Sequence, residues 1–328
     1  MKIREMILAY SGMIFGKEDY WHPEMKASSN INGNEIADYY VDTRPKHIYP
    51  GKLDEEGIPL LEVEGKYMYN FVTVAQFALG NYDKYYDTKN EKYMEVVKKC
   101  CDWFLKEVNE IEPGYYGYFY EELHTEYPMD KKWISALAQG QVISVLARYY
   151  DYSRDEKYLE MAKKLLKAYS IKTENTGFLT YLNGGAFFEE YPSKPSSFVL
   201  NGFIFAIWGV LDLYIVSGDE QAKKIYEMSL MTLRKNIHLY NINWLGWSRY
   251  DLYGFKIKNI TSIFYHKLHI NQLLAMYRIT GDEEYLKYSQ KWEKGKKNIF
   301  KYFIATVYKV IFKISVKNDS VYVKSIST

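Results

Sequence analysis

Four stretches of the chain repeat one arrangement of apolar and polar positions. Each begins with an aromatic-rich helix end, passes through a polar turn and continues as an amphipathic helix that opens with a glutamate: Glu91, Glu156, Glu220 and Glu283. The glutamates are 65, 64 and 63 residues apart, which leaves room in each unit for two helices of ordinary length and their connections. An Asn or Asp precedes each glutamate, as expected at a helix N-cap. The pattern predicts about four helical hairpin repeats.

Between the amphipathic segments lie helices that are apolar on nearly every side, at residues 72–79, 134–149, 198–214 and 269–277. Helices of this kind are buried. We therefore expect them to form the inner ring of an all-α fold, the α/α toroid, with the amphipathic helices outside. The connections that lead into the inner helices are rich in Gly, Tyr, Asn and Pro, and residues 176–191 (TGFLTYLNGGAFFEEY) hold a candidate β-hairpin. These connections are expected at the mouth of the barrel.

The two ends of the chain differ from the repeats. Residues 1–66 include the alternating segment IPLLEVEG and predict an irregular arm with short β-strands, ahead of a barrel domain at residues 67–297. Residues 298–328 are predicted as a C-terminal amphipathic helix with a lysine stripe, followed by a β-hairpin or a loose tail. This helix suits core packing, contact with a partner or the surface of a membrane, and the sequence leaves the three open.

Composition narrows the class of protein. The 328 residues carry 43 basic and 41 acidic side chains, and this net charge of +2 argues against a dedicated nucleic-acid binder. The two cysteines, Cys100 and Cys101, are adjacent, lack zinc-type spacing and are expected to be buried in a helix. The first 21 residues hold an apolar stretch too short for a transmembrane helix and no convincing cleavage site. We therefore expect a cytoplasmic protein, with membrane contact only through the C-terminal helix, and leave a homodimer open.

Several polar and aromatic residues are candidates for ligand contacts. The 35 tyrosines suit a sugar-binding cleft, because the ring covers apolar C–H faces and the hydroxyl forms hydrogen bonds, although codon bias explains the number equally well. Gln139 and Gln141 interrupt an apolar helix and indicate a buried network or ligand contacts, and Gly140 indicates the close approach of another backbone. His266 and His269 share a helix face without a third metal ligand. We expect no metal and no cofactor, and assign the histidines to substrate hydrogen bonds or to capping and core packing.

Four motifs occur together and in order along the chain: WISALAQGQVISVLAR, EEYPSKPSSFVLNGFIF, SRYDL and YHKLHINQLL. They resemble the C-terminal catalytic domain of the D-glucuronyl C5-epimerases, over about residues 67–288. That family inverts C5 of glucuronate within heparan-type polymers, on a helical α/α barrel. The resemblance implies an acidic polysaccharide as substrate and four catalytic residues: Glu190, Tyr191, Tyr250 and Tyr265. The chain departs from the family where Tyr253 and Gly254 replace a basic residue after YDL, and where the large β-domains before the barrel are nearly absent.

Inversion at C5 requires an acid or base on each face of the sugar. Removing the proton builds negative charge beside a carboxylate, and preorganised donors or cations must stabilise it. A tyrosine, whose pKa is about 10 in water, needs a nearby cation or donor to act as a base. The expected donors are Arg249, His266 and His269.

From this chemistry we expect Tyr250 and Tyr265 to be the acid/base tyrosines, with Glu190 and Tyr191 as the opposing or relaying pair. The residues expected to bind substrate are Tyr69, Trp133, Gln139, Gln141, Asn201, Arg249, His266 and His269.

Three other functions stay open. A polysaccharide lyase on the same scaffold shares the proton abstraction. An inverting glycosidase would need two carboxylates about 6.5–9.5 Å apart across the cleft, and the candidates are Glu121, Glu122, Glu189, Glu190 and Asp251. The third alternative is a glycan-binding module without activity.

Overall fold

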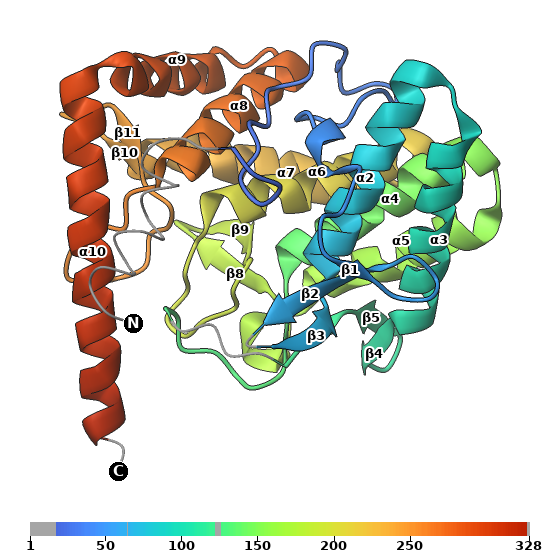
Figure 1. The fold of residues 1–328 in the computed structure, drawn as a ribbon, viewed down its shortest axis with the longest axis horizontal. Helices are drawn as coiled ribbons and strands as arrows, with labels where there is room; N and C mark the ends of the chain where they lie inside the picture. Colours follow the sequence, from blue (N-terminus) through green and yellow to red (C-terminus); the bar gives the residue numbers. More distant parts are fainter. Residues whose placement is uncertain (1–17, 64, 122–125, 327–328) are drawn as a thin grey trace.

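The computed structural model describes residues 18–63, 65–121 and 126–326, with side chains described as far as residue 316. Its body consists of helical hairpins, which confirms the all-α toroid and its four repeats (Figure 1). The inner helices are α2 (Phe71–Thr88), α4 (Ala136–Ser153), α6 (Leu200–Ser217) and α8 (Ile263–Thr280). The outer helices are α3 (Glu91–Glu107), α5 (Glu156–Leu166), α7 (Glu220–Asn236) and α9 (Glu283–Lys297).

Each hairpin turns in the same way. The inner helix ends at a residue in the left-handed conformation, and the next helix begins at the predicted glutamate, one residue after a side-chain N-cap. The caps are Asn90, Asp155, Asp219 and Asp282, and each side chain accepts a hydrogen bond from a backbone N–H of the first turn. The local sequence therefore determines where every outer helix starts.

The inner helices stand side by side in chain order, with α4 against α6 as the tightest pair. A Cβ added at Gly140 of α4 would lie 2.5 Å from the Cα of Ala206, and one at Gly209 of α6 would lie 2.1 Å from the Gly140 carbonyl oxygen. The two backbones touch here, which confirms the close approach predicted at Gly140. Cys100 and Cys101 are free and buried, also as predicted. Among the described residues, α6 alone has the length and apolarity of a membrane span, but 78% of it is buried.

The N-terminal arm lies across the C-terminal halves of the inner helices and passes between α8 and α2 (Figure 1). One polar side chain from each inner helix holds the arm by hydrogen bonds: Asp83 of α2, Arg148 of α4, Asp212 of α6 and Arg278 of α8. We call this end of the barrel the closed end. The opposite end, where the inner helices begin, is the mouth.

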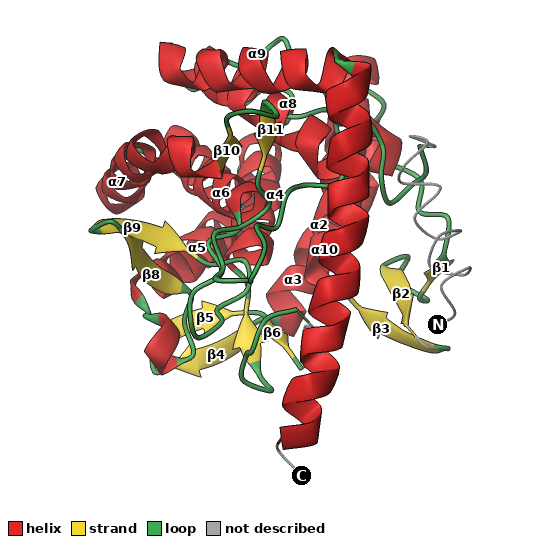
Figure 2. Ribbon diagram, turned by 90° about the vertical axis from the view of Figure 1, so that its left-hand side faces the viewer, coloured by secondary structure: helices red, strands yellow, loops and turns green. Residues whose placement is uncertain are grey.

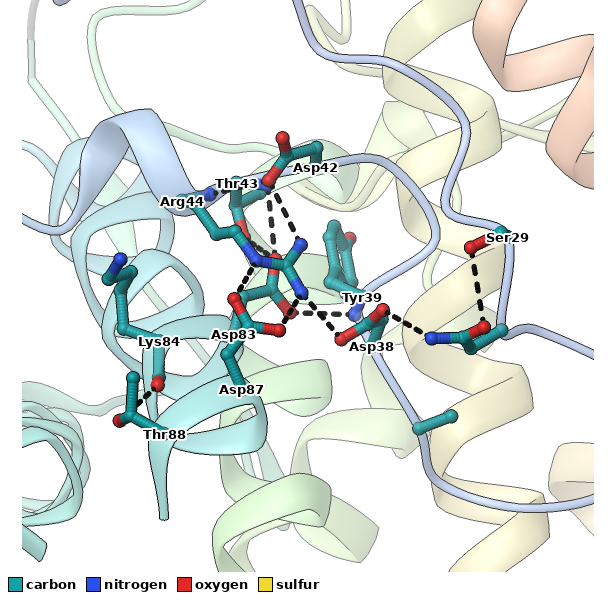
Figure 3. Close-up of polar contacts among 12 residues, drawn as sticks. Ser29, Asp38, Tyr39, Asp42, Thr43, Arg44, Asp83, Lys84, Asp87 and Thr88 are labelled. Carbon is teal, nitrogen blue, oxygen red and sulfur yellow. Dashed lines mark hydrogen bonds and ion pairs between the residues drawn. The ribbon is translucent and has the colours of Figure 1, made fainter. Parts of the chain in front are cut away.

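A second set of contacts fixes the arm to α2 (Figure 3). Arg44 forms a two-pronged ion pair with Asp87 of α2, at 2.6 and 2.7 Å, and also pairs with Asp38 at 2.9 Å. Thr43 donates its hydroxyl to the buried Asp83 carboxylate at 2.6 Å. These contacts hold the short 3-10 helix η1 (Arg44–Lys46) against the barrel.

Short β-structure precedes every inner helix (Figure 2). A three-stranded antiparallel sheet, as predicted for the arm, leads to α2: β1 (Lys52–Leu53), β2 (Pro59–Val63) and β3 (Lys66–Tyr69). The other strands pair as antiparallel hairpins: β4 (Asn109–Glu112) with β5 (Tyr115–Gly117), β6 (Phe119–Tyr120) with β7 (Trp133–Ile134), β8 (Leu179–Leu182) with β9 (Gly185–Phe188), and β10 (Asn241–Ile242) with β11 (Trp247–Ser248). The remaining 3-10 helices are η2 (Lys167–Ser170), η3 (Thr173–Asn175) and η4 (Ile237–Tyr240).

The hairpin β8–β9 confirms the one predicted within residues 176–191. Its two-residue turn consists of Asn183 and Gly184, both with positive φ, as a type I′ turn requires.

The C-terminal helix α10 (Ile299–Ile326) runs along one side of the molecule and extends past the barrel (Figure 1). The β-hairpin or loose tail predicted for its last residues is wrong, because the helix continues to Ile326. Lys309 and Lys313 of the predicted lysine stripe face the barrel, while Phe300 and Phe303 are exposed. The domain boundaries at residues 66 and 297 stay predictions, and the expectation for residues 1–17 lies outside the described residues.

Candidate active site

Two cavities open at the mouth of the barrel. The barrel cavity, of about 320 Å³, is lined by the first turns of all four inner helices and by the arm. The helix cavity, of about 220 Å³, lies between the mouth and α10. Tyr191 and Tyr265 line both cavities, so they form the wall between them. The site is built around this wall.

The loop that leads into α6 contains two adjacent glutamates, Glu189 and Glu190, with different environments. Glu189 is fully buried, and its carboxylate accepts hydrogen bonds from the Ser197 hydroxyl at 2.5 Å and from the Phe198 N–H at 3.0 Å. These bonds close the loop on itself, since residues 189 and 197 become neighbours. Burial raises the pKa of Glu189 to about 8. Glu189 lines neither cavity and holds the loop in shape.

Glu190 points the other way and lines the barrel cavity. Its carboxylate accepts a hydrogen bond from the Asn201 amide at 3.2 Å and another from the Tyr191 hydroxyl. A Cβ at Gly202 would lie 2.4 Å from the nearer Glu190 oxygen, so only glycine lets the carboxylate rest on the first turn of α6. Burial raises the pKa of Glu190 to about 7. The group is therefore balanced between its acid and its base form near neutral pH.

The loop that carries Tyr250 is tied to the rest of the mouth by the next residue. Asp251 is fully buried and accepts hydrogen bonds from the Tyr127 hydroxyl and the Asn259 amide, both at 2.5 Å. The Asn259 oxygen in turn accepts a hydrogen bond from Lys309 of α10 at 2.6 Å. One buried carboxylate thus connects three segments around Tyr250.

The three predicted tyrosines meet at the wall between the cavities. Tyr191 interacts with Glu190 on one side and with Tyr250 on the other, and Tyr250 interacts with Tyr265. The rings of Tyr250 and Tyr265 pack edge to face with centroids 4.9 Å apart. Burial raises the pKa of Tyr265 to about 12 and those of Tyr191 and Tyr250 well above their usual value. The four residues form one row of interacting groups, in which the tyrosines are neutral phenols at neutral pH.

Two lysines that the motifs do not contain belong to the mouth. Lys309 lines the helix cavity, and its ammonium lies 5.9 Å from the centre of the Tyr250 ring. Lys46 of η1 lines the barrel cavity. Burial lowers the pKa of each lysine to about 8. The lysine rhythm along α10 was the one sequence signal for Lys309, and no motif marked Lys46.

Of the residues predicted to bind substrate, Trp133 and Asn201 line the barrel cavity. Trp133 stacks on Tyr120 with ring centroids 4.7 Å apart, which gives the cavity an aromatic wall. Tyr69 lies outside both cavities, where its exposed hydroxyl donates to Asp54 at 2.7 Å. The prediction for Tyr69 is therefore wrong for this conformation.

Neither glutamine reaches a cavity. The Gln139 amide donates to the carbonyl oxygens of Tyr116 and Leu165, at 2.9 and 3.0 Å, and so holds neighbouring loops together. Gln141 is fully buried, and its amide has no hydrogen-bond partner among the described residues. Of the two interpretations left open from sequence, the geometry of Gln139 favours the structural one.

The two histidines are fully buried, and the prediction that they bind substrate is wrong. His266 stacks on Trp247 with centroids 3.8 Å apart and forms a hydrogen bond with the Ser248 hydroxyl at 2.8 Å. His269 has no hydrogen-bond partner among the described residues. Burial lowers the pKa of His266 well below its usual value and that of His269 to about 3. Neutral at physiological pH, neither supplies a cation.

Arg249 lines neither cavity, although it directly precedes Tyr250. Arg249 forms a β-bridge with Ile260, and adjacent residues of such an extended segment point to opposite sides. The expected cation beside Tyr250 is Lys309 instead. Throughout the described part of the chain, no three His, Cys, Asp or Glu side chains gather closely enough to hold a metal ion.

The family comparison agrees with this geometry. A family model described as D-glucuronyl C5-epimerase C-terminus matches residues 110–294, more than half of the chain. The D-glucuronyl C5-epimerase of Caenorhabditis elegans is 30% identical over 221 residues, which are 62% of this chain and 35% of that protein. The uncharacterized protein MJ1128 of Methanocaldococcus jannaschii is 31% identical over 196 residues, 58% of this chain and 62% of that one. The chain spans less than two thirds of either relative.

Solved structures with the same fold are more distant in sequence. Cellobiose 2-epimerase from Spirochaeta thermophila superposes with a TM-score of 0.54 at 9% identity, over 89% of this chain and 84% of that one. The α-1,6-mannanase GH76A of Salegentibacter superposes with a TM-score of 0.53 at 16% identity, over 78% and 68%. These two likenesses concern the fold, the α/α toroid. The match to the family model shows that the chain belongs to the D-glucuronyl C5-epimerase family.

Proposed function

We propose that this chain is a uronate C5-epimerase that acts on a glucuronate-containing polysaccharide by removing and returning the proton at C5. The family and its named relative support a carbohydrate epimerase. The finer assignment rests on one observation: Glu190 and three tyrosines, from three separate segments, form a row of interacting groups at the wall between two cavities.

In the proposed mechanism, Glu190 is the base. With a pKa of about 7, its carboxylate form is well populated at neutral pH and takes H5 from one face of the sugar. The electrons of the C5–H bond move into the carboxylate of the sugar, which then carries a second negative charge. Tyr265, a phenol with a pKa of about 12, delivers a proton to the opposite face of C5.

The same row of groups accounts for how the site resets. After one turnover Glu190 holds a proton and Tyr265 lacks one. Tyr191 and Tyr250 lie between them, so their hydroxyls can pass a proton from Glu190 back to Tyr265. The same step in reverse prepares the site for the other epimer.

Lys309 places a positive charge beside the tyrosines. Its ammonium faces the Tyr250 ring from α10 and lines the helix cavity. A cation held in a partly buried site favours the phenolate that remains when a tyrosine has given up its proton. Lys309 takes over the role that sequence assigned to Arg249.

A glycosidase is less well supported. Of the carboxylates named for it, Glu189 and Asp251 are fully buried in structural hydrogen bonds, and Glu121 is exposed and lines neither cavity. Glu122 lies outside the described residues. Glu190 is thus the one described member of that set in a cavity, and an inverting glycosidase needs two.

One assay separates the remaining functions. The full chain is incubated in D₂O with a panel of glucuronate polymers. An epimerase places deuterium at C5 and leaves the chain length unchanged. A new double bond with chain cleavage identifies a lyase, new reducing ends without it identify a glycosidase, and either result overturns the proposal. Unchanged polymer across the panel also overturns it.

A further inference from the structure

Lys46 is a buried lysine that feels the charge of Asp19 only from a distance, without an ion pair between them. It is 4% exposed, and within the described residues its ammonium forms no ion pair and no hydrogen bond. The ammonium lies 4.6 Å from the centre of the Tyr20 ring and 5.9 Å from that of Trp21. Two aromatic faces recover part of the cost of burying a charge. Among the described residues the ammonium thus has no ion-pair partner, and an anion that enters the cavity can pair with it.

The backbone under Lys46 is held rigidly. Asp87 forms an ion pair with Arg44, two residues before Lys46, and Asp83 accepts a hydrogen bond from the Thr43 hydroxyl. A Cβ at Gly80 of α2 would lie 2.6 Å from the Thr43 carbonyl oxygen and 2.9 Å from the Lys46 carbonyl carbon, so the arm and α2 touch backbone to backbone. Such anchoring is what a preorganised binding group requires.

The rest of the barrel cavity suits a sugar ring. Trp133, stacked on Tyr120, offers a flat aromatic wall, and Phe264 lines the cavity from the start of α8. Asn70 and Gln76 of the α2 end add polar groups that match hydroxyls. An aromatic wall for the C–H face of a sugar and one cation together define a site for an acidic sugar.

We propose that Lys46 is the receptor for the carboxylate of a uronate unit held in the barrel cavity, so that the N-terminal arm contributes to substrate recognition. The arm lies before the residues that the family model matches, and nothing in that match covers Lys46. This role for Lys46 rests on the proposed function only in that the ligand is taken to be a uronate. It assigns a binding role, distinct from the proton transfer at Glu190 and Tyr265.

Binding without turnover tests the proposal. Isothermal titration calorimetry compares a tetrasaccharide of alternating glucuronate and N-acetylglucosamine with the same tetrasaccharide after reduction of its carboxylates to alcohols. Lys46→Met keeps the aliphatic stem over Tyr20 and Trp21 but removes the charge. We expect it to lose about tenfold or more in affinity for the acidic ligand and less than twofold for the reduced one. Lys46→Arg should retain the preference for the acidic ligand.

Lys52→Met is the matched control, because Lys52 also lies over an aromatic ring, that of Tyr67 at 4.9 Å, but is exposed and outside the cavity. It should bind both ligands like the wild type. Thermal unfolding should show that Lys46→Met is at least as stable as the wild type, since an uncompensated buried charge is removed. Equal losses for both ligands, an unchanged preference for the acidic ligand, or a clear drop in stability would each overturn the proposal.

The two proposals fail separately. A preference for the acidic ligand that depends on Lys46, without any exchange at C5, would leave the receptor standing and remove the epimerase. Exchange at C5, together with an unchanged preference of Lys46→Met for the acidic ligand, would support the epimerase and remove Lys46 as the receptor.

Discussion

At its closed end the barrel buries an ion pair, whereas at its mouth it buries two charged side chains, Glu190 and Lys46, against a cavity. Arg148 and Asp212 form an ion pair at 3.0 Å, both essentially inaccessible, and Tyr40 donates a second hydrogen bond to Asp212. At the mouth, Glu190 and Lys46 are almost as deeply buried, yet each lines the barrel cavity and no ion pair among the described residues joins either to an opposite charge. The paired charges hold the arm in place. The charges at the cavity are available for a ligand and for proton transfer.

The tyrosines at the mouth give the largest expected effect. Tyr265→Phe and Tyr250→Phe each remove one hydroxyl from the row of interacting groups, and we expect exchange at C5 to fall by about 100- to 10,000-fold, the range typical of a lost acid or base. The rate of deuterium incorporation at C5 measures it. Tyr253→Phe, in the same loop but outside both cavities, is the matched control and should keep most of its activity. Wild-type exchange in both cavity variants would remove these tyrosines from the mechanism.

Substitutions at the closed end should lower the stability of the protein rather than its activity. Asp212→Asn leaves Arg148 as an uncompensated buried charge, and we expect the free energy of unfolding to fall by about 3 kcal/mol, with exchange per folded molecule unchanged. Urea unfolding measures the loss. Glu56→Gln breaks the exposed pair with Lys106 and should change stability by less than about 1 kcal/mol. A stable Asp212→Asn protein that no longer exchanges would show that the closed end takes part in the chemistry.

A change of pH should have a smaller effect, with the rate of exchange falling about tenfold per pH unit on either side of the optimum. Glu190, with a pKa of about 7, is protonated at lower pH and cannot accept H5, so the rate should rise with pH up to about 7. Lys46 and Lys309, each with a pKa of about 8, lose their charge above it, so the rate should fall there. The profile of kcat/KM against pH should be bell-shaped. A rate that stays constant from pH 5 to 7 would exclude Glu190 as the base.

Sequence predicted the repeats well because the signals are local. A cap, a glutamate and an apolar face determine each hairpin without reference to the rest of the chain. The pair Glu190–Tyr191 and the two further tyrosines followed from motifs. The motifs did not predict that Lys46 and Lys309 belong to the site. These lysines come from opposite ends of the chain and reach the mouth only in the folded protein. His266 and His269 were misjudged because spacing shows that two residues share a helix face, and packing alone decides whether that face meets a cavity or the core.

The neighbouring glutamates allow the most direct test. Glu189→Gln and Glu190→Gln make the same chemical change in adjacent residues, one in the structural hydrogen bonds of the loop and one in the cavity. Deuterium incorporation at C5 is measured for both and divided by the fraction of folded protein. We predict that Glu190→Gln folds normally and loses at least about 100-fold in exchange, whereas Glu189→Gln loses stability but keeps its exchange per folded molecule. Equal exchange in the two variants would contradict the account.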